Sequence, residues 1–174
     1  MRSKRLGDAR GEGQAGNVTV ELALVLPFLL LVLAGIVDLG MLYWEKHVLT
    51  NAAREGARAA ARSTVAGAAG LRQSEVKNIV CRYLYAFNLK KGDGTPLVTQ
   101  VVQDVTYTLN AGTCNYTFPS SGPGTPVTVE LINIPVKMML LPNIQSLFGG
   151  GGGSEVNLSA RNTMAAEWST PPAP

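Results

Sequence analysis

The chain contains a single histidine, His47, in 174 residues, and this scarcity limits the chemistry that it can perform. A nucleophilic enzyme needs a base beside its nucleophile, and most transition-metal sites draw on several His or Cys ligands. The sequence also contains no HExxH motif, no phosphate-binding loop and no dinucleotide-binding glycine pattern. These absences predict that the protein is not an enzyme and that it holds neither a metal ion nor a cofactor.

The chain also has little surplus charge. It contains 15 Lys and Arg residues against 12 Asp and Glu residues, which gives a net charge of +3. Four of the basic and two of the acidic residues lie within residues 1–16, so the remainder is close to neutral. A nucleic-acid-binding domain requires a basic stripe on its folded surface. We therefore expect no nucleic-acid partner.

Only two cysteines are present, Cys81 and Cys114. They are separated by 32 intervening residues, unlike the CxxC spacing of redox motifs. In an oxidising compartment the pair predicts one disulfide. Two buried thiols are the alternative, because free cysteine packs as a small apolar residue. The disulfide is favoured if this part of the chain lies outside the cytoplasm.

Apolar residues are abundant near the N-terminus. Residues 22–37 carry no charge, and the apolar stretch continues to Tyr43 and Trp44, whose rings suit a membrane–water interface. As a helix, residues 22–44 would extend about 35 Å, which is enough to cross a bilayer. The stretch is longer than the core of a typical secretory signal. We predict a transmembrane helix over residues 17–44, in which Asp38 reaches interfacial water.

Charge does not decide the orientation of this helix. Four basic residues precede it, and four others follow within about 20 residues: Lys46, Arg54, Arg58 and Arg62. The cysteine pair and the strand-rich C-terminal region favour an extracytoplasmic location for residues 45–170.

One carboxylate stands at the start of the apolar run. Glu21 is the fifth residue after Gly16, where the basic leader ends. An ionisable group in a membrane segment is costly and usually has a partner or a task. Cleavage between Gly16 and Asn17 would create an ammonium group close to this carboxylate. The spacing therefore points to a processing site, with a partnerless interfacial carboxylate as the alternative.

Two helical segments follow one another after the apolar run. Residues 45–69 are rich in alanine and favour continuation of the first helix. Small residues recur there at a spacing of four, which suits close packing against a partner helix, the chain's own domain, or both. A second helix is predicted from Ser74, as its N-cap, to Asn88.

Four strands are expected after Pro96, because apolar residues alternate there. Residues 105–109 and 114–118 indicate a hairpin, and residues 127–138 and 156–168 form two longer strands. The inward-facing positions of the third strand shift by one at Ile132, which indicates a β-bulge or a bend helped by Pro135. The predicted fold class is α+β: a single N-terminal transmembrane helix extends into a small domain with a second helix and a mainly antiparallel β-sheet.

Two further segments are expected to be irregular. Residues 140–148 are largely apolar, and we interpret them as a lid over the sheet, with a partner-binding patch as the alternative. The five glycines at 149–153 that follow are expected to form a flexible tether. Residues 171–174 are predicted to be a disordered tail.

Several N-terminal motifs occur in the order found in the TadE-like family. They are Gly16, Glu21, Pro27, the Asp38–Gly40 segment and the block Asn51–Arg58. The leader and the glycine–glutamate spacing also resemble the processing site of type IV pilins. Residues 16–62 therefore resemble the start of TadE-like proteins, whereas the strand-rich remainder carries no such motif.

This resemblance implies a minor pilin or pseudopilin of a tight-adherence (Tad, type IVc-like) pilus assembly or secretion system, which supports pilus biogenesis and surface adherence. By analogy, a prepilin peptidase of the bacterial inner membrane would remove residues 1–16, a cytoplasmic leader, by cutting between Gly16 and Asn17. Glu21 would then pair with the N-terminal amine of a neighbouring subunit or of its own chain. The implied partners are the inner membrane, the peptidase, other pilin or pseudopilin subunits and the assembly platform. The alternatives are a permanently membrane-anchored or a secreted extracytoplasmic binding protein outside any filament.

Overall fold

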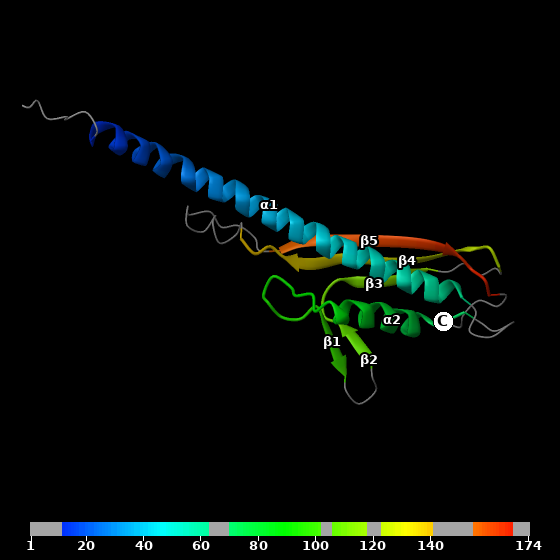
Figure 1. Ribbon diagram of the computed structural model, residues 1–174. Coiled ribbons are helices and arrows are strands. Elements are labelled where there is room, and N and C mark those ends of the chain that lie inside the picture. The colour runs from blue at the N-terminus through cyan, green and yellow to red at the C-terminus, as the bar shows by residue number, and fades with distance from the viewer. Residues whose placement is uncertain (1–11, 63–69, 102–105, 118–122, 141–154, 169–174) are drawn as a thin grey trace, which may run out of the picture.

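A computed structural model describes residues 12–62, 70–101, 106–117, 123–140 and 155–168 (Figure 1). The expected lid and tether at 141–153, the tail at 171–174 and most of the leader lie outside the described residues. The described elements are helices α1 (Glu12–Ala61) and α2 (Gln73–Ala86) and strands β1 (Val98–Val101), β2 (Thr106–Leu109), β3 (Thr113–Thr117), β4 (Pro126–Lys137) and β5 (Glu155–Ala165). They confirm the α+β class, with a long N-terminal apolar helix and antiparallel sheets.

Helix α1 is one continuous helix of 50 residues, with Pro27 inside it. Its N-terminal half projects away from the domain, whereas its C-terminal half lies along β4 and β5 and contacts α2 (Figure 1). The last two carbonyl groups of α1 have donors from the C-terminal segment: Trp168 Nε1 donates to Ala60 O at 2.8 Å, and Glu167 N donates to Ala61 O at 2.7 Å. These bonds satisfy carbonyls that have no partner within the helix. The predicted continuation to residue 69 falls mainly on residues outside the described ranges.

Helix α2 begins one residue earlier than predicted, and Ser74 is not its N-cap. Arg72 is the N-cap residue, and its backbone N–H donates to Glu75 Oε2 at 2.7 Å. The Glu75 carboxylate, in the first turn of α2, therefore accepts the backbone N–H of the N-cap residue, and Ser74 remains exposed. The predicted core stripe is confirmed, since Val76, Val80 and Leu84 are buried.

The strands form two sheets, and the predicted hairpin is wrong. Strand β2 pairs with β1, whereas β3 pairs with β4 in the sheet β3-β4-β5. Asn110 explains this choice, because its backbone N–H donates to Leu97 O and its side chain donates to Pro96 O, both at 2.9 Å. These bonds hold the end of β2 beside the start of β1. The prediction missed β1 because its two apolar residues, Val98 and Val101, are three positions apart and do not alternate as in a strand.

The β-bulge expected at Ile132 is confirmed. The register between β4 and β5 shifts between Leu131 and Ile134, so that Ile132 and Asn133 oppose Ser159. Asn133 adopts a positive φ of 54°, and its N–H donates to Ser159 Oγ at 3.3 Å. The extra residue keeps Leu131 and Ile134 both buried in the core.

The core lies between the three-stranded sheet and the two helices. The small residues of α1 are buried within this core: Ala52, Ala53, Gly56, Ala57 and Ala60. A Cβ atom on Gly56 would lie only 2.5 Å from Val80 Cγ2, so the backbone of α1 approaches α2 closely. Of the roles expected for this stripe, the structure shows packing against the chain's own domain.

We expect Gly56→Ala to destabilise the protein by about 1–3 kcal/mol, because the added Cβ atom would lie only 2.5 Å from Cγ2 of the fully buried Val80. The measurement is thermal or denaturant unfolding of the full chain in detergent micelles. Gly40→Ala is the matched control, since a Cβ atom there would meet nothing within 4 Å and should leave stability unchanged or slightly raised. Equal unfolding midpoints for both variants would contradict the close approach.

Candidate functional site

The N-terminal half of α1 is an apolar surface without a partner among the described residues. Large apolar side chains cover it on all sides, including Leu24 at 77% and Phe28 at 69% exposure. The helix is long and apolar enough to cross a membrane, and its apolar window is almost entirely unburied. Such exposure suits lipid or a neighbouring apolar helix rather than water.

The predicted processing site lies on this projecting part of the helix. The backbone of Gly16, Asn17 and Glu21 is helical, so the three residues occupy one continuous stretch of α1. The Glu21 side chain is exposed and forms no ion pair with any residue in the described ranges. The folded domain thus brings no described cation to Glu21, and its predicted pairing stays a prediction.

Asp38 does not reach interfacial water, as had been expected, but is buried. Only 1% of its surface is exposed, and its carboxylate accepts hydrogen bonds from the backbone N–H groups of Met139 and Leu140 at 3.0–3.1 Å. Hydrogen bonds to an ionised carboxylate are stronger than bonds between neutral groups. Asp38 therefore fixes the segment that follows β4 to the side of α1.

The position of this contact bears on where the membrane helix ends. Asp38 lies seven residues before the domain boundary predicted at residue 45, so the domain already packs on α1 within the predicted span. Residues 18–37 alone would extend about 30 Å as a helix, which still suffices to cross the apolar part of a bilayer. The residues after Asp38 are then suited to the headgroup region.

We expect Asp38→Asn to release the Met139–Leu140 segment from α1. Loss of the charged acceptor should speed backbone hydrogen exchange there about tenfold or more, because such bonds contribute about 1.5–3 kcal/mol. Hydrogen-exchange mass spectrometry of the full chain in micelles measures this rate. Glu21→Gln, which changes an exposed acid of the same helix, should leave it unaltered. Unchanged exchange in Asp38→Asn would show that the bonds do not hold the segment.

A second buried acid, Glu45, lies just beyond the predicted span. Its exposure is 6%, and its Oε2 atom has no hydrogen-bond partner among the described residues. Burial raises the pKa of Glu45 from 4.5 to about 7. Glu45 lines a cavity of about 350 Å³ between α1, the end of α2 and the segment after β4. The lining residues are Met41, Trp44, Glu45, Phe87, Asn88, Leu89, Lys90, Gly94, Lys137 and Met139.

Glu45 is not among the sites predicted from the sequence, although the sequence contains a signal for its burial. Residues 38, 45, 49, 52 and 56 recur at helical spacing, and all five are buried. This spacing places both acids on the face of α1 that packs against the domain.

We expect Glu45 to make stability depend on pH. The carboxyl group is protonated in the folded chain below about pH 7 but ionises near pH 4.5 when unfolded, so its favourable contribution is lost as pH rises through this range. Glu45→Gln should therefore be more stable than the wild type by about 1–3 kcal/mol at pH 8 and equally stable at pH 4. The measurement is the unfolding midpoint in lipid-free micelles from pH 4 to pH 8.

The control for this pH series is Glu167→Gln, which alters an exposed acid near the other end of α1. It should reproduce the pH dependence of the wild type. A Glu45→Gln chain with the same pH profile as the wild type would show that Glu45 is not buried as described.

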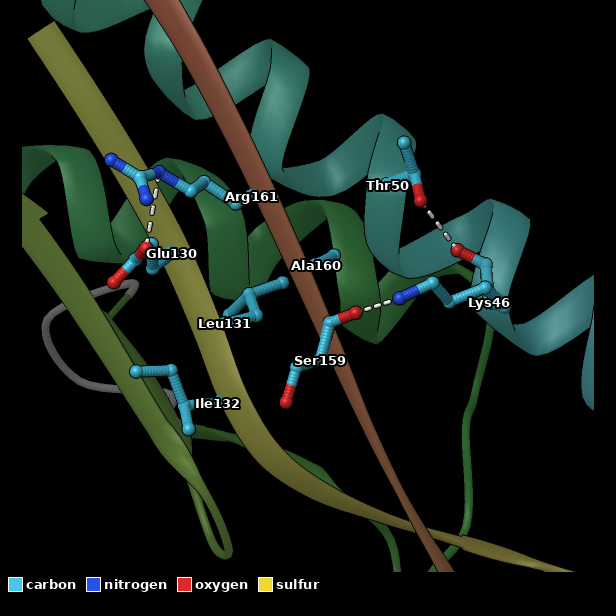
Figure 2. Close-up of a pocket in the computed structure, with 8 residues that line it drawn as sticks. All are labelled: Lys46, Thr50, Glu130, Leu131, Ile132, Ser159, Ala160 and Arg161. Carbon is cyan, nitrogen blue, oxygen red and sulfur yellow. Dashed lines mark hydrogen bonds and ion pairs between the residues drawn. The ribbon is translucent and has the colours of Figure 1, made fainter.

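Another cavity, of about 390 Å³, lies where α1 crosses the bulged strands (Figure 2). Lys46 Nζ points across it and donates to Ser159 O, and Arg161 Nε lies 3.1 Å from Glu130 Oε1 (Figure 2). The charged groups that line this cavity already have partners within the chain. We therefore regard the cavity as part of the packing between helix and sheet rather than as a ligand site.

Cys81 and Cys114 lie in the same core, on α2 and β3. Both are thiols in this structure. Burial, with a smaller contribution from nearby Cys81, raises the pKa of Cys114 to about 11. Their disulfide remains a prediction. His47 is exposed, and no group of three His, Cys, Asp or Glu residues suited to a metal ion occurs in the described ranges.

Comparison with known proteins gives one match. Residues 16–58 match the family described as TadE-like protein, as the sequence predicted. This region is about a quarter of the chain and coincides with most of α1, from its exposed half to three residues before its end. The match points to a membrane-anchored protein associated with a Tad pilus. Neither a curated protein nor a solved structure matches the chain.

Proposed function

We propose that this protein is a minor pilin or pseudopilin of a Tad-type pilus or secretion system, anchored in the bacterial inner membrane with its domain outside the cytoplasm. The observation that carries the proposal is the exposed Glu21 on an unpacked apolar helix, within the segment that matches TadE-like proteins. In this proposal a prepilin peptidase cuts between Gly16 and Asn17. The chain is the substrate of that enzyme and catalyses nothing itself.

The physical basis of assembly in this proposal is the cost of an unpaired charge in lipid. Glu21 has no described partner in its own chain, and a charged residue inside a bilayer costs several kcal/mol. Cleavage supplies an ammonium group at Asn17, which can neutralise a carboxylate at low dielectric. A subunit whose Glu21 meets that amine is therefore favoured over one that stays alone in the membrane.

The helix geometry gives the stagger that such a pair would impose. Glu21 lies four residues after Asn17, which corresponds to about 6 Å along a helix. If the amine of one subunit meets Glu21 of its neighbour, the two apolar helices are displaced by about one turn. Their exposed apolar surfaces can then pack side by side along most of their length.

The fold also supports a structural role for the domain. The bonds from Met139 and Leu140 to Asp38, and those from Glu167 and Trp168 to the end of α1, connect the domain to both ends of the packed half of the helix. A force applied to the domain is thus carried to the membrane segment by many contacts rather than by a linker.

We expect the mature protein in peptidase-competent cells to begin at Asn17, and we expect Glu21→Ala to abolish incorporation into sheared filaments while the protein remains in the membrane fraction. The reason is that Ala leaves the apolar span intact but removes the partner of the amine. N-terminal sequencing and immunodetection in the two fractions measure these results. Glu55→Ala, which alters an acid on the solvated side of α1, should assemble like the wild type.

The same experiment separates the alternatives. An intact Met1 in peptidase-competent cells indicates a permanently anchored protein, and a start beyond the apolar run indicates a secreted one. Either result, or normal assembly of Glu21→Ala, contradicts the proposal.

A further inference from the structure

The cavity beside Glu45 lies at the end of the predicted membrane helix, residues 17–44. Met41, Trp44 and Glu45 line it from α1, and Met139 lines it from the segment that Asp38 fixes to the helix. Trp44 and Met139 are 44% and 53% exposed, which places apolar surface at the rim. A tryptophan at this height is typical of the headgroup region of a bilayer.

The chemistry inside the cavity is unusual for a structural void. Glu45 is more than nine-tenths buried, and Oε2 finds no donor in the described part of the chain. Lys90 and Lys137 line the same cavity, but neither forms an ion pair with Glu45. A buried oxygen without a donor costs free energy, so the site is suited to a ligand that brings an N–H or O–H group to Glu45.

The aromatic residues of the cavity indicate what kind of donor fits. The Trp44 and Phe87 rings lie with their centroids 6.3 Å apart and their planes inclined at 69°. Ring faces attract cations, and aromatic rings beside an acid form a common setting for an ammonium group. Lys90 and Lys137 line the same cavity and supply positive charge for an anion, as phosphate requires.

We propose that this cavity binds the headgroup of a phospholipid that carries a primary ammonium, such as phosphatidylethanolamine. The ammonium group donates to Glu45 beside Trp44 and Phe87, and the phosphate lies against Lys90 and Lys137. A glycerol headgroup can donate an O–H group but has no cation for the carboxylate and the rings. A choline headgroup has a cation but no N–H to donate to Oε2. The acyl chains leave over the apolar rim toward the bilayer.

The test uses the purified full chain in nonionic micelles, with phosphatidylethanolamine, phosphatidylglycerol and phosphatidylcholine titrated separately and bound lipid counted by intact-complex mass spectrometry. We expect phosphatidylethanolamine to bind about tenfold more tightly than either other lipid, since a charge-assisted hydrogen bond contributes that much. Equal binding of the three lipids by the wild type would overturn the proposal.

Variants locate the site within the chain. Glu45→Gln should reduce the affinity for phosphatidylethanolamine to that for phosphatidylglycerol, and Glu167→Gln, an exposed acid at the other end of the domain, should preserve the preference. Replacement of both Lys90 and Lys137 by Gln should weaken all three lipids. A preference that survives in Glu45→Gln, or full affinity in the double lysine variant, would overturn the assignment.

The source of the headgroup is distinguished by the water-soluble compound O-phosphorylethanolamine. It should compete only weakly, because it lacks the chains that meet the apolar rim. Competition at the affinity of the lipid would assign the cavity to a free small molecule and overturn the lipid assignment. The inference needs only the membrane anchor, so N-terminal processing at Asn17 and binding of lipid at Glu45 can fail independently.

Discussion

The close contact between the C-terminal half of α1 and the domain is the constraint on which the remaining structure depends. Alanines and Gly56 remove side-chain bulk from one face of the helix, so α2 and the sheet approach its backbone directly. Buried valines and leucines of the domain then cover the stripe and form the core. The sheet bulges at Ile132 and Asn133, which returns later residues of β4 to the same inner face. Without the small residues, this single helix could not serve as both the membrane anchor and the centre of the domain.

Three acids along α1 show that the role of a carboxylate depends on its surroundings. Glu21 is exposed on the apolar half, Asp38 accepts two backbone N–H groups, and Glu45 is buried with an oxygen that has no described donor. Asp38 is thereby a structural residue. Glu21 and Glu45 are each suited to a cation from outside the chain, and we propose a subunit amine for the first and a lipid ammonium for the second. Both ligands would come from the membrane environment, which is where an uncompensated carboxylate costs most.

The sequence and the structure agree best where a strong local signal exists. Composition predicts the apolar run and the alanine-rich continuation of the first helix, and periodicity predicts the stripe of α2 and the bulge at Ile132; the structure contains each of them. The predicted hairpin between residues 105–109 and 114–118 is wrong, because alternation identifies a strand without identifying its neighbour. Asn110 joins β2 to the preceding strand by long-range bonds that no local pattern encodes. The buried state of Asp38 was missed for the same reason, since its partners lie about 100 residues away.

The sequence by itself determined the order of the motifs from Gly16 to Arg58, the length of the apolar helix and the match to TadE-like proteins, because these depend on residue type and spacing along one chain. Only the tertiary structure decided which acids are solvated and which are buried. It also decided that the small-residue stripe faces the domain and that a cavity forms where α1, α2 and β4 meet. Each of these outcomes depends on contacts between residues far apart in the chain, and burial is a property of all the elements that surround a residue rather than of the residue itself.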